Sequence, residues 1–196
     1  MVGRPREFVE EEALERACEL FWRQGYEATS LNQLVESMGI SRQSLYNTFG
    51  GKEKLFLRVI DHYTETRLAA VISLLGDEGA DLRSIEQYFG QVAAGTTMPG
   101  DVRKGCLMVN TAVELSIREG SAADKTKSFA GRLEGALLHA LEGAQAAGQT
   151  SAKCSLADTA SFLATVVQGM LVSCKTGATH QQLRTTAAIA LSTLML

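Results

Sequence analysis

The sequence predicts an all-α fold, and three observations lead to that prediction. Only two of the 196 residues are proline, so few positions interrupt a helix. No segment alternates apolar and polar residues as a half-buried strand does, and no Asn-Gly hairpin signal occurs. Apolar residues recur instead at helical spacing, in segments that often end at glycine. With 45% apolar residues, the chain has the composition to bury a sizeable core.

The first helix is predicted over residues 8–24. Its apolar residues follow the i, i+3, i+4, i+7 pattern, which places on one face Leu14, Ala17, Cys18 and Phe21. Gly25 supplies the stop. Because Cys18 lies within this stripe, we interpret it as a core residue and not as a reactive thiol.

Two short helices follow, joined by a tight turn. Ser30, with Gln33 three residues later, has the pattern of a capping box, and Gly39 ends the helix that it opens. Ser41 is a second N-cap candidate, for a helix over residues 42–49. Two short helices that meet across a glycine-containing turn have the layout of a helix-turn-helix. The second helix of that motif enters the major groove of DNA.

The residues of the second short helix divide into an inner and an outer set. Leu45 and Phe49, four residues apart, are expected to face inward, which leaves outward Arg42, Gln43, Ser44, Tyr46 and Asn47. Arginine can pair two donors with guanine, and glutamine or asparagine can pair bidentately with adenine. Thr29 and Lys52 begin their helices, where backbone N–H groups favour phosphate. Each residue alone is typical of any surface, but together they predict contact with double-stranded DNA.

The charge distribution is consistent with that prediction, although the net charge is −3. From residue 39 to 58 the chain carries four basic residues and one acidic residue, Glu53; the basic ones are Arg42, Lys52, Lys54 and Arg58. Ordinary solvated charges would give the same count, so charge by itself does not decide between the two interpretations.

The rest of the chain is predicted to be helical as well, with polar or glycine-containing links between helices. The expected ranges are 52–75, 81–94, 105–118, 122–146, 156–176 and 180–196. The first of these is expected to be one continuous strut.

The run GISRQSLYNTFGGKEKLF, from Gly39 to Phe56, resembles the signature of the TetR family of regulators, as does the upstream pattern of Phe21, Gly25, Tyr26, Thr29 and Leu34. The resemblance covers roughly residues 3–60. It implies a helix-turn-helix DNA-binding domain at 1–50 and a helical signal-sensing and dimerisation domain at 51–196. It also implies a homodimeric repressor on a near-palindromic operator.

The resemblance assigns roles to individual residues. Positions matching Thr29, Tyr46 and Lys52 touch phosphate, and those facing bases match Arg42, Gln43, Ser44 and Asn47. Gly51 stands where many members have Ser or Asp as the cap of the next helix, at small expected cost. Arg4 resembles part of a basic arm that enters the minor groove, or else belongs to a disordered terminus.

Two apolar stripes near the end of the chain are expected to form the dimer interface, because the last two helices of the family pair with their mates. The stripes consist of Leu156, Ala160, Leu163, Val167, Met170 and Leu171, and of Leu183, Ala187, Ala190, Leu191 and Leu194. Taken alone, such stripes are more often protein core.

The family resemblance also implies an apolar cavity for a small-molecule inducer. Candidate lining residues are Tyr88, Phe89, Met108, Asn110, Phe129, Phe162, Gln168 and Met170. A few polar groups in an apolar wall are normal for such a site. Plain packing is the alternative for each of them.

Cys106 is a candidate sensor of an electrophile inducer. It follows Arg103 and Lys104 and is expected to open a helix, and both features favour the reactive thiolate. The segment resembles the family branch that answers electrophiles and oxidants, including the repressor of N-ethylmaleimide reductase, and Lys175 is a candidate partner that would lower the thiol pKa. A buried, inert cysteine is the alternative.

Other classes of function find little support. The histidines, His62, His139 and His180, lie in no nucleophile motif, so we do not expect an enzyme, a cofactor or a metal. We expect a cytoplasmic protein without a membrane span, because there is no signal-peptide pattern and no run of about 18 apolar residues. A helical protein-interaction module without sequence-specific DNA binding remains the alternative.

Overall fold

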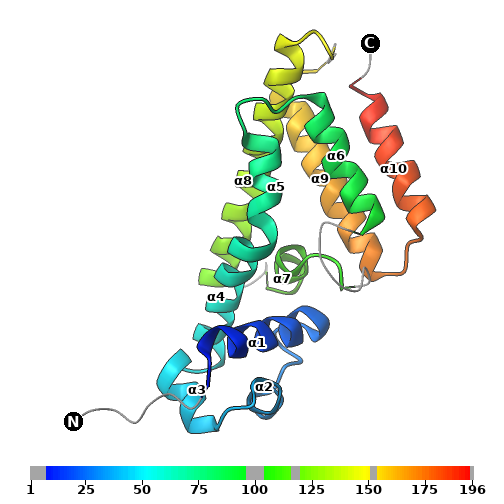
Figure 1. The fold of residues 1–196 in the computed structure, drawn as a ribbon. Coiled ribbons are helices and arrows are strands. Elements are labelled where there is room, and N and C mark those ends of the chain that lie inside the picture. The colour runs from blue at the N-terminus through cyan, green and yellow to red at the C-terminus, as the bar shows by residue number, and fades with distance from the viewer. Residues whose placement is uncertain (1–7, 96–103, 116–119, 151–153, 195–196) are drawn as a thin grey trace.

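The computed structural model describes residues 8–95, 104–115, 120–150 and 154–194, and within these ranges every regular element is a helix (Figure 1). The elements are α1 (Glu10–Gln24), α2 (Leu31–Met38), α3 (Arg42–Phe49), α4 (Lys52–Tyr63), the π-helical segment η1 (Thr64–Leu68), α5 (Ala69–Gly76), α6 (Leu82–Ala94), α7 (Leu107–Leu115), α8 (Ser121–Ala146), α9 (Leu156–Lys175) and α10 (His180–Ser192). The predicted all-α fold is confirmed.

Helices α1 to α3 and the start of α4 form a headpiece at one end of the molecule (Figure 1). The Ser30 and Gln33 capping box is present, and Ser41 accepts a hydrogen bond from the backbone N–H of Ser44. The headpiece core includes Phe21 and Phe56, whose ring centroids are 4.8 Å apart. The caps thus define where α2 and α3 begin, and the aromatic contact joins α1 to α4.

The predicted continuous helix over residues 52–75 is wrong in one respect, because the π-helical segment η1 divides it into α4 and α5. Two threonine hydroxyl groups donate hydrogen bonds to backbone carbonyls in this segment. Thr64 donates to the carbonyl of Ile60 (2.8 Å) and Thr66 to that of His62 (2.7 Å). Such bonds compete with the helical ladder, and π-helical turns concentrate at functional sites. The strut nevertheless runs from the headpiece into the body (Figure 1).

The body is a bundle in which α8 packs against α9, α5 and α7, and α6 packs against α10. Helix α7 lies between α1 and the bundle (Figure 1). It begins at Leu107, two residues later than predicted, because Gly105 has a left-handed φ of 64°. Its predicted end at 116–118 lies outside the described residues.

The two apolar stripes predicted as a dimer interface lie largely inside the chain. On α9, Ala160, Leu163 and Val167 are fully buried, and on α10 Leu183 and Ala190 are buried. The helical period turns these residues towards α8 and α6, so the faces available to a second copy are the opposite ones. Those faces expose Phe162 (44%) and Ile189 (64%).

Helix α9 is also the one described helix that is long and apolar enough to cross a membrane by length and composition alone. In its most apolar window, 39% of the residues are buried inside the structure. Core helices meet the same criterion, so this is weak evidence for a membrane span.

Candidate functional site

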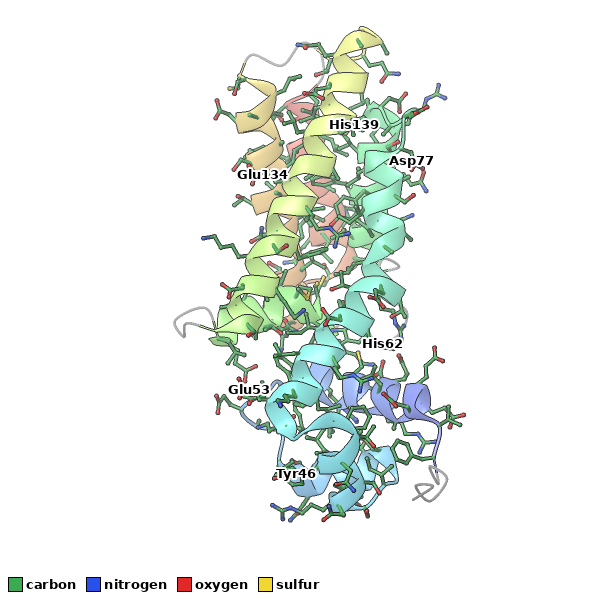
Figure 2. All side chains as sticks on the ribbon, turned by 90° about the vertical axis from the view of Figure 1, so that its left-hand side faces the viewer. Tyr46, Glu53, His62, Asp77, Glu134 and His139 are labelled. Carbon is green, nitrogen blue, oxygen red and sulfur yellow. The ribbon has the colours of Figure 1, made fainter. Side chains whose placement is uncertain are left out.

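The outer face of α3 carries the predicted DNA-contacting set. Leu45 is fully buried and Phe49 is 3% exposed, whereas Tyr46 is 45% exposed. Arg42, Gln43 and Asn47 are exposed too, and Ser44 is half-buried. Tyr46 lies at the end of the headpiece farthest from the body (Figure 2). Helix α3 therefore presents a polar surface on an anchored, apolar base.

Hydrogen bonds organise part of this surface. The Gln43 side-chain amide donates to Asn47 Oδ1 (2.8 Å), and the hydroxyl groups of Ser41 and Ser44 lie 2.9 Å apart. Paired amides and a capped hydroxyl limit the freedom of these side chains. Because ordering flexible side chains on binding costs free energy, the pairing lowers that cost for a partner that contacts this face.

The phosphate-contact residues predicted beside α3 have different outcomes. The Lys52 ammonium group lies 4.3 Å from the centre of the Tyr26 ring, at the start of α4. Thr29 does not lie on the surface: it is fully buried, and its hydroxyl group donates to the carbonyl of Gly25 (2.6 Å). The hydroxyl group therefore supports the turn, and phosphate contact by Thr29 stays a prediction. Arg4 lies outside the described residues.

The predicted positive charge is partly neutralised. Arg58, one of the four basic residues near α3, pairs with Glu10 of α1 and stacks on the Phe49 ring, 4.9 Å from its centre. It thus joins α4 to the rest of the headpiece.

A pocket of about 490 Å³ lies in the body between η1, α5, α6, α7, α8 and α9. Of the predicted lining residues, Tyr88, Met108, Phe129 and Gln168 contribute to it, as does Cys106. Most of the wall is apolar, and no charged side chain of the described residues lines it. Apolar walls with a few polar groups are typical of small-molecule sites.

Four other predicted sensor residues do not line this pocket, and neither does Lys175. Phe89 is fully buried in the core, and Met170 is buried as well, whereas Phe162 points out of α9. The Asn110 side-chain amide donates to the carbonyl of Lys104 (2.8 Å), on the other side of α7. Neighbouring positions on a helix face different directions. Residue type alone therefore does not determine which of these side chains face the pocket.

Cys106 borders the pocket but is not activated as predicted. It is 1% exposed, and burial raises its pKa, an effect that the backbone N–H groups of Val109 and Met108 and the Tyr63 hydroxyl only partly oppose. Lys104 is committed to Glu19, at 2.6 Å. Lys175 is exposed at the end of α9 and is not among the groups that shift the pKa. The thiol form is therefore favoured.

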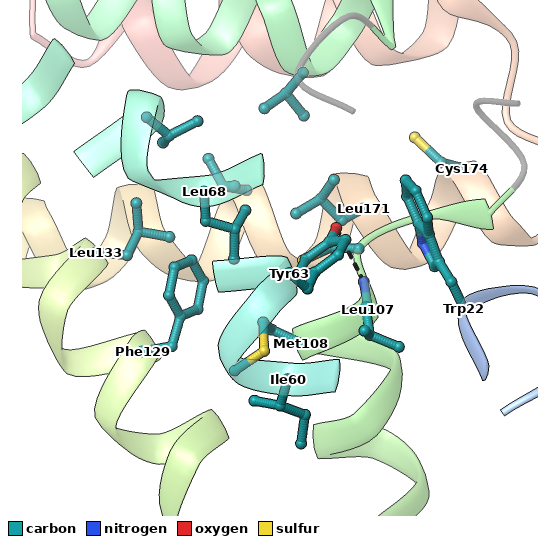
Figure 3. Packing of buried hydrophobic residues seen from close by; sticks show 14 of the residues in the cluster. Trp22, Ile60, Tyr63, Leu68, Leu107, Met108, Phe129, Leu133, Leu171 and Cys174 are labelled. Atoms are coloured by element: carbon teal, nitrogen blue, oxygen red, sulfur yellow. Dashed lines mark hydrogen bonds between the residues drawn. The ribbon is translucent and has the colours of Figure 1, made fainter. Parts of the chain in front are cut away.

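The segment that carries Cys106 is tied to the headpiece. The Trp22 indole N–H donates to the carbonyl of Gly105 (3.0 Å), and the backbone N–H of Leu107 donates to the Tyr63 hydroxyl (3.3 Å). Figure 3 shows Trp22 and Tyr63 on either side of this segment. Neither residue lies in a motif that marks it in the sequence, although Trp22 is the single tryptophan of the chain. Among the described residues, no group of acidic, His and Cys side chains could hold a metal ion.

Known regulatory proteins resemble both the headpiece and the body of this chain. Residues 13–59 match the model of bacterial regulatory proteins of the tetR family, and residues 82–190 match that of the tetracyclin repressor-like C-terminal domain. The chain is 37% identical over 183 residues to the HTH-type transcriptional repressor ComR of Escherichia coli, covering 92% of this chain and 86% of that protein.

Solved structures share the fold over nearly the whole chain. A cysteine variant of the regulator CifR, complexed with a 26-bp double-strand operator DNA, is 28% identical with a TM-score of 0.80, covering 96% of this chain and 98% of that one. The reduced form of E. coli NemR has a TM-score of 0.81 at 19% identity, covering 94% and 95%. At that identity the likeness to NemR shows the fold alone, and a place in an electrophile-sensing branch stays a prediction.

Proposed function

Because the chain belongs to the tetR family of bacterial regulatory proteins, which are helix-turn-helix DNA-binding transcriptional regulators, we propose that it is a homodimeric repressor of a near-palindromic operator. One observation carries the proposal: α3 exposes Arg42, Gln43 and Asn47 over buried Leu45 and Phe49. The described part of the chain offers no comparable motif for catalysis, so the proposal is a binding protein and not an enzyme.

In the proposed complex, α3 lies in the major groove. Arg42, Gln43 and Asn47 read base edges, and each good bidentate pair is worth about 1–3 kcal/mol of discrimination. Tyr46 and Lys52 contact phosphates, which fix the register without reading sequence. A basic N-terminal arm with Arg4 is a further proposed contact, in the adjacent minor groove.

The proposed dimer places two copies of α3 on half-sites about one helical turn, or ~34–36 Å, apart. The outer faces of α9 and α10, with Phe162 and Ile189, suit a symmetric contact because they expose large apolar side chains. The start of α4 at Lys52 supports a division into a DNA-binding domain at 1–50 and a sensing and dimerisation domain at 51–196.

The proposed signal is a neutral, apolar small molecule in the 490 Å³ pocket. A charged ligand would lose its hydration without gaining a partner, because no charged side chain of the described residues lines the wall. A thiol-reactive inducer would have to enter the pocket to reach buried Cys106. If such a reagent still induces a Cys106→Ser variant, Cys106 is not the sensor. The proposal of a small-molecule site in the pocket would then stand without the thiol.

The proposal is tested by selecting bound duplexes from a random pool and titrating the selected sequence at several salt concentrations. A repressor of this kind enriches a near-palindrome and loses affinity steeply with salt, since phosphate contacts release counterions. A helical protein-interaction module without DNA specificity would enrich no common sequence.

A further inference from the structure

Helix α7 has one face on the pocket and the other on the headpiece. Its residues Met108, Val109, Ala112 and Val113 line the pocket. At about 100° per residue, Glu114 projects nearly opposite the centre of that face. A helix of nine residues thus separates the pocket from the turn that follows α1.

The Glu114 carboxylate binds that turn through both of its oxygens. Oε2 accepts the backbone N–H of Tyr26 (3.0 Å), and Oε1 accepts the backbone N–H of Glu27 (2.7 Å). Successive N–H groups in a turn form a concave site for an anion, and hydrogen bonds to an ionised acceptor are stronger than neutral ones. The contact joins positions 88 and 87 residues apart in the chain.

The turn is shaped around this carboxylate. Gly25 has a φ of 88°, and a Cβ atom there would lie 2.7 Å from Glu114 Oε2. Glycine therefore permits both the left-handed backbone and the close approach of the acidic side chain.

The other end of α7 is held as well. The Trp22 indole N–H bonds to the carbonyl of Gly105, and the Tyr63 hydroxyl accepts the N–H of Leu107. Both partners belong to helices of the headpiece or its strut. Because α7 is held at each end, a ligand in the pocket that displaces α7 also has to disturb these contacts.

We propose that Glu114 is the positioning residue that couples occupation of the pocket to the orientation of the headpiece. This inference rests on the proposed function, because it requires the pocket to control DNA binding. Pressure on Val109 and Ala112, which are partly buried in the pocket wall, moves the carboxylate relative to the N–H groups of Tyr26 and Glu27. A shift of about 1 Å takes hydrogen bonds of this length out of range, and the headpiece loses its fixed angle.

A double-mutant cycle tests the coupling without a ligand. Ala130→Phe places a larger side chain into the pocket from α8, and Glu114→Ala removes the contact to the turn. In the parent, A130F is expected to weaken binding of the selected duplex by between about 5-fold and 150-fold, the usual range of coupling between sites. In the E114A background the contact is already lost, so A130F should change duplex binding by no more than about twofold, which is the usual scatter of additive mutations.

Matched variants separate coupling from folding. Glu134→Ala removes an exposed carboxylate from α8 (Figure 2) and should leave the full A130F effect. Glu114→Gln keeps one acceptor oxygen and should give an intermediate effect, which serves if E114A does not fold. Trp22 is the only tryptophan and bonds to Gly105, so A130F should change its emission in both backgrounds.

Three results would overturn the inference. An equal A130F effect with and without Glu114 would show that the carboxylate only supports the turn, and the pocket-regulated repressor would stand. An A130F variant with parental DNA binding and unchanged Trp22 emission would remove pocket control, and the inference with it. A parent that selects no duplex would remove the proposed function itself.

Discussion

Gln43 and Asn47 are two of the side chains on α3 that we propose to read base edges. They are one helical turn apart, and the Gln43 amide already donates to Asn47 Oδ1. Helical periodicity predicted that both residues face outward, because Leu45 and Phe49 are the only apolar residues available to anchor the helix between Ser41 and Gly50 apart from the amphipathic Tyr46. The local sequence pattern is sufficient to predict which side chains face outward when they lie on a short helix that borders solvent.

Replacing Gln43 with alanine should weaken binding of the selected operator by about 1–3 kcal/mol and relax the preference at one base pair of each half-site. The measurement is a fluorescence-anisotropy titration against the operator and its single-base variants. Lys52→Ala is the comparison, since loss of a phosphate contact weakens all sequences alike and lowers the salt dependence. A uniform loss with Q43A would contradict base reading by this residue.

The environment of Cys106 could not be predicted from its neighbours in sequence. Lys104, adjacent to the Cys106 segment, is directed to Glu19 of α1, and the thiol is enclosed together with Tyr63 of α4. Basic residues next to a cysteine in sequence lower its pKa only if the fold leaves their charge beside the sulfur. Burial, set by residues more than 40 positions away, decides the outcome instead.

Alkylation by iodoacetamide should therefore distinguish the cysteines of the folded protein. Exposed Cys154 should react first, and the buried thiols of Cys18 and Cys106 much more slowly, because it is the thiolate that attacks the reagent and displaces iodide. Burial raises the pKa of Cys18 to about 12 from an ordinary 9.0. The corresponding stability is present below pH 9.0 and is lost as the pH rises towards 12, since the unfolded chain ionises first. Peptide mapping by mass spectrometry at pH 8 measures the order of reaction, and equal rates would contradict it.

At the scale of elements, caps and glycine stops predicted most helix ends within a few residues. The π-helical segment η1 was not predictable in the same way. Its threonines bond to carbonyls within the helix, and Leu68 at its end lines the pocket. Apolar periodicity in the sequence predicts a regular helix, and it gives no sign of a local change in the backbone hydrogen-bond pattern.

Alanine substitution at two glycines of α8 is expected to have opposite effects on stability. A Cβ at Gly143 would lie 2.1 Å from the carbonyl oxygen of Ala80, whereas one at Gly131 would meet nothing within 4 Å. Gly143→Ala should destabilise the protein by about 1–3 kcal/mol through overpacking. Gly131→Ala should stabilise it by up to about 1 kcal/mol, because alanine favours the helix. Urea unfolding followed by circular dichroism compares the two, and a stabilised G143A variant would refute the close approach of α8 to the α5–α6 link.

At the scale of the whole molecule, contacts between distant segments join the body to the headpiece. The Glu114 carboxylate and the Tyr26 and Glu27 N–H groups are far apart in sequence, and no local motif marks them. The family resemblance predicted that the two parts communicate, but the residues that join them emerge only when α7 is seen against α1.

The assembly prediction follows from the outer faces of α9 and α10. Phe162 and Ile189 are 44% and 64% exposed, and an apolar pair at a self-complementary contact would bury the same patch twice. Introducing lysine at both positions should give a folded monomer, because two like charges on each protomer would meet across the symmetry axis without a partner. Sedimentation measures the assembly, and circular dichroism checks the fold. Gln87→Lys, which adds a charge at an exposed position of α6, should leave the dimer intact. Since a single headpiece contacts only one half-site, the monomer should also lose most of its operator affinity; a dimer that persists in the double lysine variant would locate the interface elsewhere.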